Sequence, residues 1–339
     1  LAFSLAAWMA GCTVGRSAVV PPAVSFDGSA YHTFVVPAPL LPFVGQVAPD
    51  MRGREAFQEV DYRAVFGTMA KWAVEIDRVE RIPEIVSRAW TVATTGRPGP
   101  VVIALPEDML SSETDTPAIS GPVEILPPAP SGPAVARARE ILQGAKRPLL
   151  FFGGSNWTEE GKAALRRFAE ENDIPAVAVF RYLDMFDNHS PAFCGHSGVG
   201  MWPSTRKLIQ EADVILAINL RFGENSTGGY TLLKVPDPEQ TLIHVHGSDG
   251  ELGKVYRPAL GVHADPSAFA EALVAAGPLG PRDGTWRAEA RAAFEAGFEL
   301  PEQPSPVDMG KVMAHLAEVL PDDAILTNGA GNFAVWPGY

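Results

Sequence analysis

The chain has 339 residues, of which 46% are apolar, and its 27 basic and 40 acidic residues give a formal net charge of -13. This length and composition are typical of a soluble protein with more than one hydrophobic core. The acidic balance, with no cluster of Lys and Arg, excludes a nucleic-acid-binding protein and a general affinity for anionic membranes.

The two cysteines, Cys12 and Cys194, are too few for a disulfide framework, and no CxxC or His/Cys cluster has metal-ligand spacing. We interpret both as incidental or buried thiols. No apolar run is long enough for a transmembrane helix. The apolar start, residues 1–12, lacks the basic residues that open a signal peptide, so we expect a cytoplasmic protein.

The beginning of the chain differs from the rest. Residues 1–49 contain only two charged residues, Arg16 and Asp27, and no helical or strand period. From Leu41 onward, short apolar runs alternate with amphipathic stretches, as in a parallel α/β sheet. We interpret residues 1–40 as atypical, with a frame-shifted translation as the first hypothesis. A shortened paralogue that has lost catalysis is the alternative, and the abrupt change within a domain favours the first.

The alternating pattern predicts the elements in chain order. The expected strands are β-branched or leucine-rich and are bounded by Gly, Pro or Asn. They cover residues 41–47, 100–105, 148–152, 175–180, 213–219, 241–246 and 323–328. The expected helices cover residues 81–95, 158–172, 203–212, 266–276, 286–296 and 306–320. The predicted fold class is α/β, with doubly wound parallel-sheet domains.

Two proline-rich stretches, residues 112–132 and 277–305, interrupt this alternation and are interpreted as linkers. They leave three blocks, residues 41–111, 133–276 and 306–339. The central block has an ordinary domain size. We expect residues 131–276 to fold alone.

A polar loop follows the first predicted strand and reads RGREAFQEVDY over residues 52–62. On residue types alone, this is a solvated loop whose Phe57 packs onto the following helix. However, FVGQVAPDMRGREAFQEVDYRAVFGTMAKWAVEI and GRPGPVVIALPEDM resemble the pyrimidine-binding domain of thiamine-diphosphate-dependent enzymes of the acetolactate synthase type, in the large catalytic subunit. The resemblance implies that Gln58 donates a hydrogen bond to the substrate or intermediate and that Phe57 walls the substrate pocket. A neutral amide suits that task, because it stabilises a developing oxyanion without quenching a carbanion.

The last predicted strand runs into a glycine-rich turn, residues 328–333. Such a turn at the start of a helix offers free backbone amides to an anion, although a simple strand-to-helix turn is the alternative. In the resembling family this turn begins the diphosphate-binding domain. The resemblance therefore implies that Gly329, Ala330, Gly331 and Asn332 contact the diphosphate end of the cofactor.

The central block resembles the family's central domain, which holds a flavin in acetolactate synthases. Its Gly153-Gly154 pair permits close backbone approach, either by a phosphate or by a neighbouring element. Arg221-Phe222 match the family's loop, whereas Gly223-Glu224-Asn225 replace the expected aspartate pair and arginine. FAD binding is therefore in doubt. Residues 195–200 match a flexible glycine loop, to whose His196 we assign no role.

The resemblance implies thiamine diphosphate and Mg²⁺ as cofactors of an intact parent enzyme that is a homodimer or homotetramer in branched-chain amino acid biosynthesis. Two expected parts are missing. Residues 1–40 contain no glutamate to activate the cofactor, and the metal-binding GDG segment does not occur before Tyr339. We predict no metal ligands, and we expect the chain to be a fragment that is inactive by itself.

The function implied is decarboxylation of a 2-oxo acid and condensation of the product with a second carbonyl compound. A benzoylformate-decarboxylase-like enzyme, or another carboligase or decarboxylase of the family, is the first alternative. A catalytically dead binding or assembly module is the alternative from another class.

Overall fold

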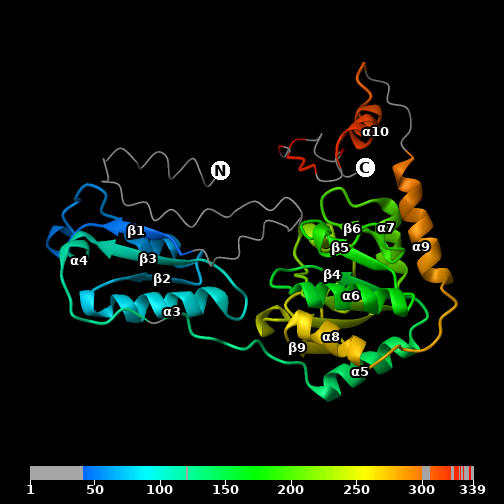
Figure 1. Ribbon diagram of the computed structural model, residues 1–339, viewed down its shortest axis with the longest axis horizontal. Helices are drawn as coiled ribbons and strands as arrows, with labels where there is room; N and C mark the ends of the chain where they lie inside the picture. The colour runs from blue at the N-terminus through cyan, green and yellow to red at the C-terminus, as the bar shows by residue number, and fades with distance from the viewer. Residues whose placement is uncertain are drawn as a thin grey trace. The chain divides into compact units, whose positions relative to one another are not determined.

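The computed structural model describes residues 41–119, 121–299, 306–321, 324–327, 329, 331 and 336 (Figure 1). The expectations for residues 1–40 lie outside this range. Residues 112–119 and 121–131 belong to no helix or strand, and on either side of them the chain forms a parallel sheet.

The strands are β1 (Phe43–Gln46), β2 (Trp72–Glu75), β3 (Val101–Pro106), β4 (Pro148–Phe152), β5 (Ala176–Val179), β6 (Phe193–Ser197), β7 (Val214–Ile218), β8 (Thr241–His246) and β9 (Leu260–His263). The α-helices are α2 (Tyr62–Phe66), α3 (Ile82–Thr94), α4 (Glu107–Ser111), α5 (Gly132–Gly144), α6 (Glu159–Glu171), α7 (Pro203–Glu211), α8 (Pro266–Ala275), α9 (Thr285–Glu295) and α10 (Met309–Val319).

The first sheet has the strand order β1-β3-β2, with both pairings parallel. Helix α3 buries Ile85, Ala89 and Ala93, which are four residues apart and therefore share one face. They pack against β3, whose Val101 and Ile103 are fully buried. Because the strands are parallel, the loops that follow β1 and β2 leave the same edge of the sheet.

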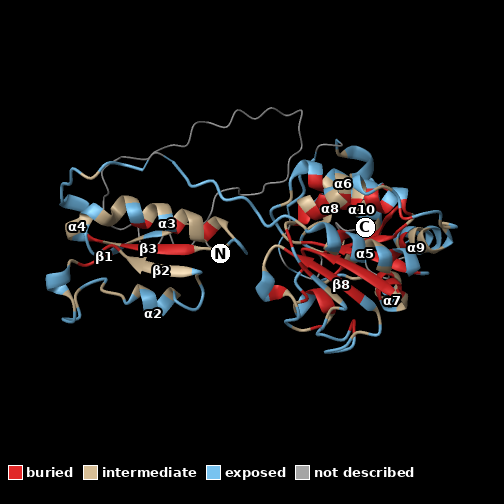
Figure 2. Cartoon of the chain, turned by 90° about the horizontal axis from the view of Figure 1, so that it is seen from below, coloured by how far each residue is buried: buried red, intermediate tan, exposed pale blue. Residues whose placement is uncertain are grey.

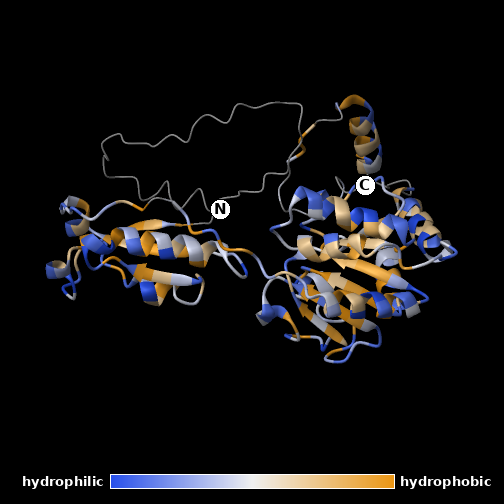
Figure 3. Ribbon diagram, turned by 60° about the horizontal axis from the view of Figure 1, so that its bottom comes forward, coloured by the Kyte–Doolittle hydropathy of each residue, from blue (hydrophilic) through white to orange (hydrophobic). Residues whose placement is uncertain are grey.

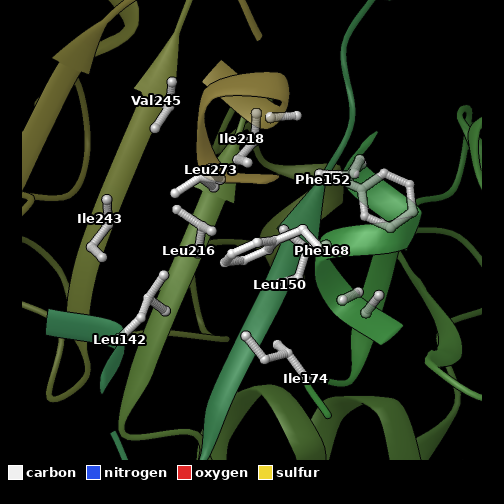
Figure 4. Close-up of a cluster of buried hydrophobic side chains, with 14 of the residues drawn as sticks. Leu142, Leu150, Phe152, Phe168, Ile174, Leu216, Ile218, Ile243, Val245 and Leu273 are labelled. Carbon is white, nitrogen blue, oxygen red and sulfur yellow. The ribbon is translucent and has the colours of Figure 1, made fainter. Parts of the chain in front are cut away.

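The central sheet has the order β6-β5-β4-β7-β8-β9, and all its pairings are parallel. Its middle strands are buried along their whole length, so they read as continuous apolar runs (Figure 2). Alternate side chains face opposite layers. Figure 4 shows one layer, in which strand residues such as Leu150, Leu216 and Ile243 meet Leu142 of α5, Phe168 of α6 and Leu273 of α8.

The opposite layer joins the other side chains of the same strands, such as Phe151 and Ile215, to Leu208 and Ile209 of α7. Figure 3 shows the matching distribution of hydropathy: the central strands are mostly hydrophobic, whereas the helices have both hydrophobic and hydrophilic residues. Thr158 begins α6 as predicted, accepting a hydrogen bond from the Gly161 amide over 2.9 Å. Every pairing among the described strands is parallel, so the predicted α/β class is confirmed.

The stretch interpreted as a second linker includes α9, which packs on the central domain. Phe294 of α9 is only 8% exposed and lies edge-on to Phe193 of β6, with ring centroids 5.5 Å apart. Arg291 of α9 donates to the carbonyl oxygens of Ser190 and Phe193 over 3.1 and 2.9 Å. Part of residues 277–305 therefore contributes to the hydrophobic core of the central domain.

Two secondary-structure expectations are wrong. Residues 193–197, part of which was read as a flexible glycine loop, form β6 beside β5. Residues 324–327 form no strand, and Ile325 and Leu326 are 66% and 55% exposed. The reason is that no described strand pairs with this segment, and a single strand leaves its backbone groups without partners. Among the described residues, no helix is long and apolar enough to cross a membrane.

Candidate functional site

The loop of residues 52–61 leaves the carboxyl end of β1 and leads into α2. Two hydrogen bonds hold its base to that strand. Gln46, the last residue of β1, donates from Nε2 to the Val60 carbonyl oxygen over 2.7 Å. Tyr62, the first residue of α2, donates from its hydroxyl to the Gly45 carbonyl oxygen over 2.8 Å. The loop therefore projects from the edge of the sheet where parallel α/β domains place their functional groups.

Glu59 organises the interior of this loop. Its carboxylate accepts hydrogen bonds from the backbone amides of Gly53 and Ala56, over 2.7 and 3.3 Å. The hydrogen bond from the Gly53 amide is the largest influence that holds the pKa of Glu59 below its ordinary value. This carboxylate is thus an ionised acceptor that closes the loop, and it is not poised to exchange a proton near neutral pH.

Phe57 and Gln58 lie at the tip of the closed loop. Phe57 is 84% exposed, so the expectation that it packs onto the following helix is wrong. Gln58 is exposed, and among the described residues its side-chain amide makes no hydrogen bond. Its φ of 68° lies in the left-handed region, which a non-glycine residue occupies only where its surroundings hold it there. The loop thus presents one apolar ring and one uncommitted amide side by side.

The predicted diphosphate-binding turn falls largely outside the described residues. Ala330 and Asn332 are among those not described, while Gly329 and Gly331 belong to no helix and no strand. Contact between these four residues and a cofactor therefore remains a prediction.

The central domain has a cleft at the carboxyl ends of its strands, with a volume of about 710 Å³. It opens beside β4 and β7, the point where the strand order reverses. Loops diverge at such a switch point, and ligands of open α/β sheets bind there. The lining includes Gly154, Asn219, Arg221, Glu224 and His246.

The Gly153-Gly154 pair is explained by a neighbouring loop. A Cβ atom at Gly154 would lie 2.1 Å from the Asn219 carbonyl oxygen, and the residue has a φ of 75°. Asn219 in turn donates from Nδ2 to the Ser155 carbonyl oxygen over 2.8 Å. Of the two explanations that the sequence left open, close approach by a protein segment accounts for the glycine without a phosphate.

Arg221, the cation in the matching loop, is paired. Its Nε lies 3.4 Å from Oε2 of Glu251, a carboxylate only 7% exposed. The same carboxylate pairs with Lys254 over 3.3 Å and with Arg97 over 3.0 Å. The sequence did not reveal Glu251 as a site residue. Its partners Arg97 and Arg221 are far from it in the chain, and no local pattern indicates such ion pairs.

Two further features of the cleft argue against a flavin. Phe222 is buried and lies edge-on to Tyr256, so it belongs to the core and does not face a ligand. Glu224 adds a negative side chain to the lining. A diphosphate needs cations or free amides, and here the matched arginine is engaged with Glu251. The matching loop therefore does not fit a flavin in the way that the family's loop would, although Arg181 also lines the cleft.

Comparison with known proteins adds to this geometry. Residues 135–273 match the family model for the thiamine pyrophosphate enzyme central domain. The chain is 29% identical to the acetolactate synthase isozyme 1 large subunit of Escherichia coli K12 over 301 residues. This alignment covers 88% of this chain and 52% of that protein. The chain belongs to the thiamine pyrophosphate enzymes of the acetolactate synthase type.

Two other relatives are the probable acetolactate synthase large subunit of Methanocaldococcus jannaschii and the mitochondrial acetolactate synthase of Schizosaccharomyces pombe. The first is 29% identical over 280 residues, with 81% of this chain and 46% of that protein covered. The second is 30% identical over 250 residues, with 67% of this chain and 37% of that protein covered. The chain thus spans about half the length of these relatives: 52% of the Escherichia coli protein and 46% of the Methanocaldococcus jannaschii protein.

Proposed function

We propose that this chain supplies the substrate-contacting loop of an enzyme that decarboxylates a 2-oxo acid and joins the product to a second carbonyl compound, with acetolactate as the product. The observation that carries the proposal is the uncommitted amide of Gln58 beside the exposed ring of Phe57, both on a loop closed by Glu59. The similarity to acetolactate synthases supports this choice of reaction.

When bound, thiamine diphosphate supplies the electron sink for loss of the carboxylate. The chain's own residues supply the rest of the chemistry proposed here. Gln58 donates from its amide to the oxygen on which negative charge develops, a contribution worth roughly 3 kcal/mol in the transition state. Phe57 forms an apolar wall that excludes water from the reacting carbonyl.

The proposed cofactor contacts are the backbone amides of Gly329, Ala330, Gly331 and Asn332 at the diphosphate end. Mg²⁺ belongs to the same proposal. Among the described residues, no group of His, Cys, Asp and Glu could hold a metal ion. Cytoplasmic location, assembly as a homodimer or homotetramer and a role in branched-chain amino acid synthesis complete the proposal.

The proposal is tested in a protein of the relatives' length that contains this chain. With thiamine diphosphate, Mg²⁺ and pyruvate, we expect acetolactate, and we expect Gln58→Ala to lower kcat by roughly 100-fold or more at unchanged Tm. Gln143→Ala is the control, because it removes an amide that donates to the Leu279 carbonyl oxygen, far from the loop in sequence and on the central domain.

The products separate the candidate functions. Aldehyde and CO₂ without acetolactate, and turnover of benzoylformate, would favour the decarboxylase alternative. Thiamine diphosphate binding without CO₂ release from any 2-oxo acid would favour a catalytically dead binding module. If Gln58→Ala lowered Tm in proportion to its loss of kcat, Gln58 would be a structural residue.

A further inference from the structure

Gln46 is a buried polar residue whose role the proposed reaction does not yet use. It is only 6% exposed, at the carboxyl end of β1. Its Oε1 accepts a hydrogen bond from the Val47 amide over 2.9 Å, and its Nε2 donates to the Val60 carbonyl oxygen over 2.7 Å. Its side chain therefore fastens the end of the loop of residues 52–61 to the end of the strand before it.

The same amide reaches across the edge of the sheet. Gln46 Nε2 lies 3.4 Å from Oε2 of Glu75, the last residue of β2. Since β3 lies between β1 and β2, this contact spans the width of the sheet. The other carboxylate oxygen of Glu75 forms an ion pair with Arg52, at the start of the loop. Gln46 and Glu75 thus hold both ends of the loop, through Val60 and Arg52.

Between these two anchors, the loop must keep Gln58 in the left-handed region, at a φ of 68°. Glu59 closes the interior of the loop, but its contacts to Gly53 and Ala56 are all within the loop. They define the shape of the loop and cannot fix its direction relative to the sheet. That direction depends on Gln46, Glu75 and the hydrogen bond from Tyr62 to Gly45.

We propose that Gln46 is a positioning residue that sets where the loop presents Phe57 and Gln58. As a catalytic statement this rests on the proposed function, whereas the anchoring of the loop can be tested without it. Gln46→Met keeps the length and bulk of the side chain but leaves the Val47 amide and the Val60 carbonyl oxygen without this partner. Leaving such groups unpaired favours local opening of the loop.

The first test uses the full 339-residue chain and trypsin. Arg54 is exposed in the loop, whereas Arg88 lies in α3, so their cleavage rates report the loop and the sheet separately. In Gln46→Met we expect cleavage after Arg54 to accelerate about tenfold, while cleavage after Arg88 stays unchanged. Gln143→Met, which removes an amide-to-carbonyl bond of the central domain, is the matched control and should change neither rate.

An unchanged rate after Arg54, or equal acceleration at both sites, would overturn the proposal, because Gln46 would then be either dispensable or a general stabiliser of the sheet. Should Gln46→Met not fold, Glu75→Gln tests the other anchor, since it removes the ion pair with Arg52. We expect cleavage after Arg54 to rise roughly two- to fivefold in that variant. No rise there would overturn the proposal as well.

The second test asks whether Gln46 acts through Gln58, in the protein of the relatives' length used above. Gln46→Met should lower kcat about tenfold, but adding it to Gln58→Ala should cause little further loss, because the positioned amide is already gone. If the kcat losses of the two single variants multiplied in the double variant, Gln46 would have a structural role, and this would overturn the proposal. If the loop loosens while Gln58→Ala leaves turnover intact, the anchoring stands and the proposed function fails.

Discussion

Trp286 donates from its indole nitrogen to the carbonyl oxygen of Pro148 over 2.9 Å, which ties α9 to the start of β4. The two residues are 138 positions apart in the chain. Beside them, Arg282 donates to the Ala145 carbonyl oxygen over 2.7 Å. The central domain therefore extends beyond α8 and includes the helix that follows.

This relationship predicts different stabilities for two segments of the chain. Residues 131–299 should unfold cooperatively, whereas residues 131–276 should be less stable by more than about 3 kcal/mol. The shorter segment loses burial of Phe294, and burial of one such ring contributes about 1.5–3 kcal/mol before the Trp286 and Arg282 contacts are considered. Urea unfolding followed by circular dichroism gives the comparison. Equal midpoints would mean that α9 contributes nothing.

Gly154 supplies a second prediction. Gly154→Ala should destabilise the central domain by roughly 2–4 kcal/mol, because its Cβ atom would lie 2.1 Å from the Asn219 carbonyl oxygen at a φ of 75°. Gly144→Ala is the matched control, since a Cβ atom there meets nothing within 4 Å. Thermal unfolding of residues 131–299 measures both variants. A tolerated Gly154→Ala would show that Asn219 can move away.

The middle of the central domain was predictable because its signals are local. The strand of residues 148–152 was predicted with the bounds of β4, since its apolar run is continuous. By contrast, β6 was misread because it contains Gly195. The structure needs that glycine, since a Cβ atom would lie 2.4 Å from Thr205 Oγ1 at a φ of 106°. The contact is to a different element, and no single-sequence pattern reveals it.

In the candidate site, too, contacts between residues distant in the chain could not be predicted from the sequence. Phe57 and Gln58 were found through a family motif, which is local in sequence. Their anchors were not, because Gln46 lies 14 residues from Val60 and 29 from Glu75. Strand β2, which carries Glu75, was also missed. It reads WAVE and none of its four residues is fully buried, so it lacks the apolar run that marked the other short strands.

Cys194 should be inert in the folded protein. Burial raises the pKa of its thiol to about 12, so the reactive thiolate is scarce at neutral pH. In a Cys12→Ser variant, which leaves one thiol, a disulfide reagent should react only as fast as the protein opens. The labelling rate should therefore rise steeply with urea. Rapid labelling without denaturant would contradict this, because it would require an accessible thiol.

The stability of the central domain should depend on pH through His244. This side chain is 2% exposed and makes a 3.1 Å contact with the Leu220 carbonyl oxygen. Burial lowers its pKa from 6.5 to about 4. The unfolded chain therefore takes up a proton below about pH 6.5 that the folded chain refuses. Stability is fully present above that pH and declines as the pH falls towards 4.

The expected loss between pH 7 and pH 5 is about 2 kcal/mol for residues 131–299, measured by urea unfolding. His244→Gln, which cannot take up this proton, should flatten most of that slope. Burial also lowers the pKa of His246, which contributes a change of the same sign and leaves some slope in the variant. An unchanged slope in His244→Gln would show that other groups cause the dependence.

The last prediction concerns the flavin. Residues 131–299 should purify without yellow colour, and the supernatant after denaturation should contain no stoichiometric flavin. The physical reason is that, in the loop that matches the family's flavin loop, Arg221 is engaged by Glu251 and Glu224 adds a negative charge. Arg181 also lines the cleft, so the prediction concerns this loop and not the charge of the whole cleft. The segment retains the described strands and helices from α5 to α9, and its urea unfolding transition shows whether a colourless protein is folded. Adding FAD to the purified domain and measuring flavin fluorescence anisotropy extends the test to weak binding. Stoichiometric flavin in either experiment would contradict the prediction.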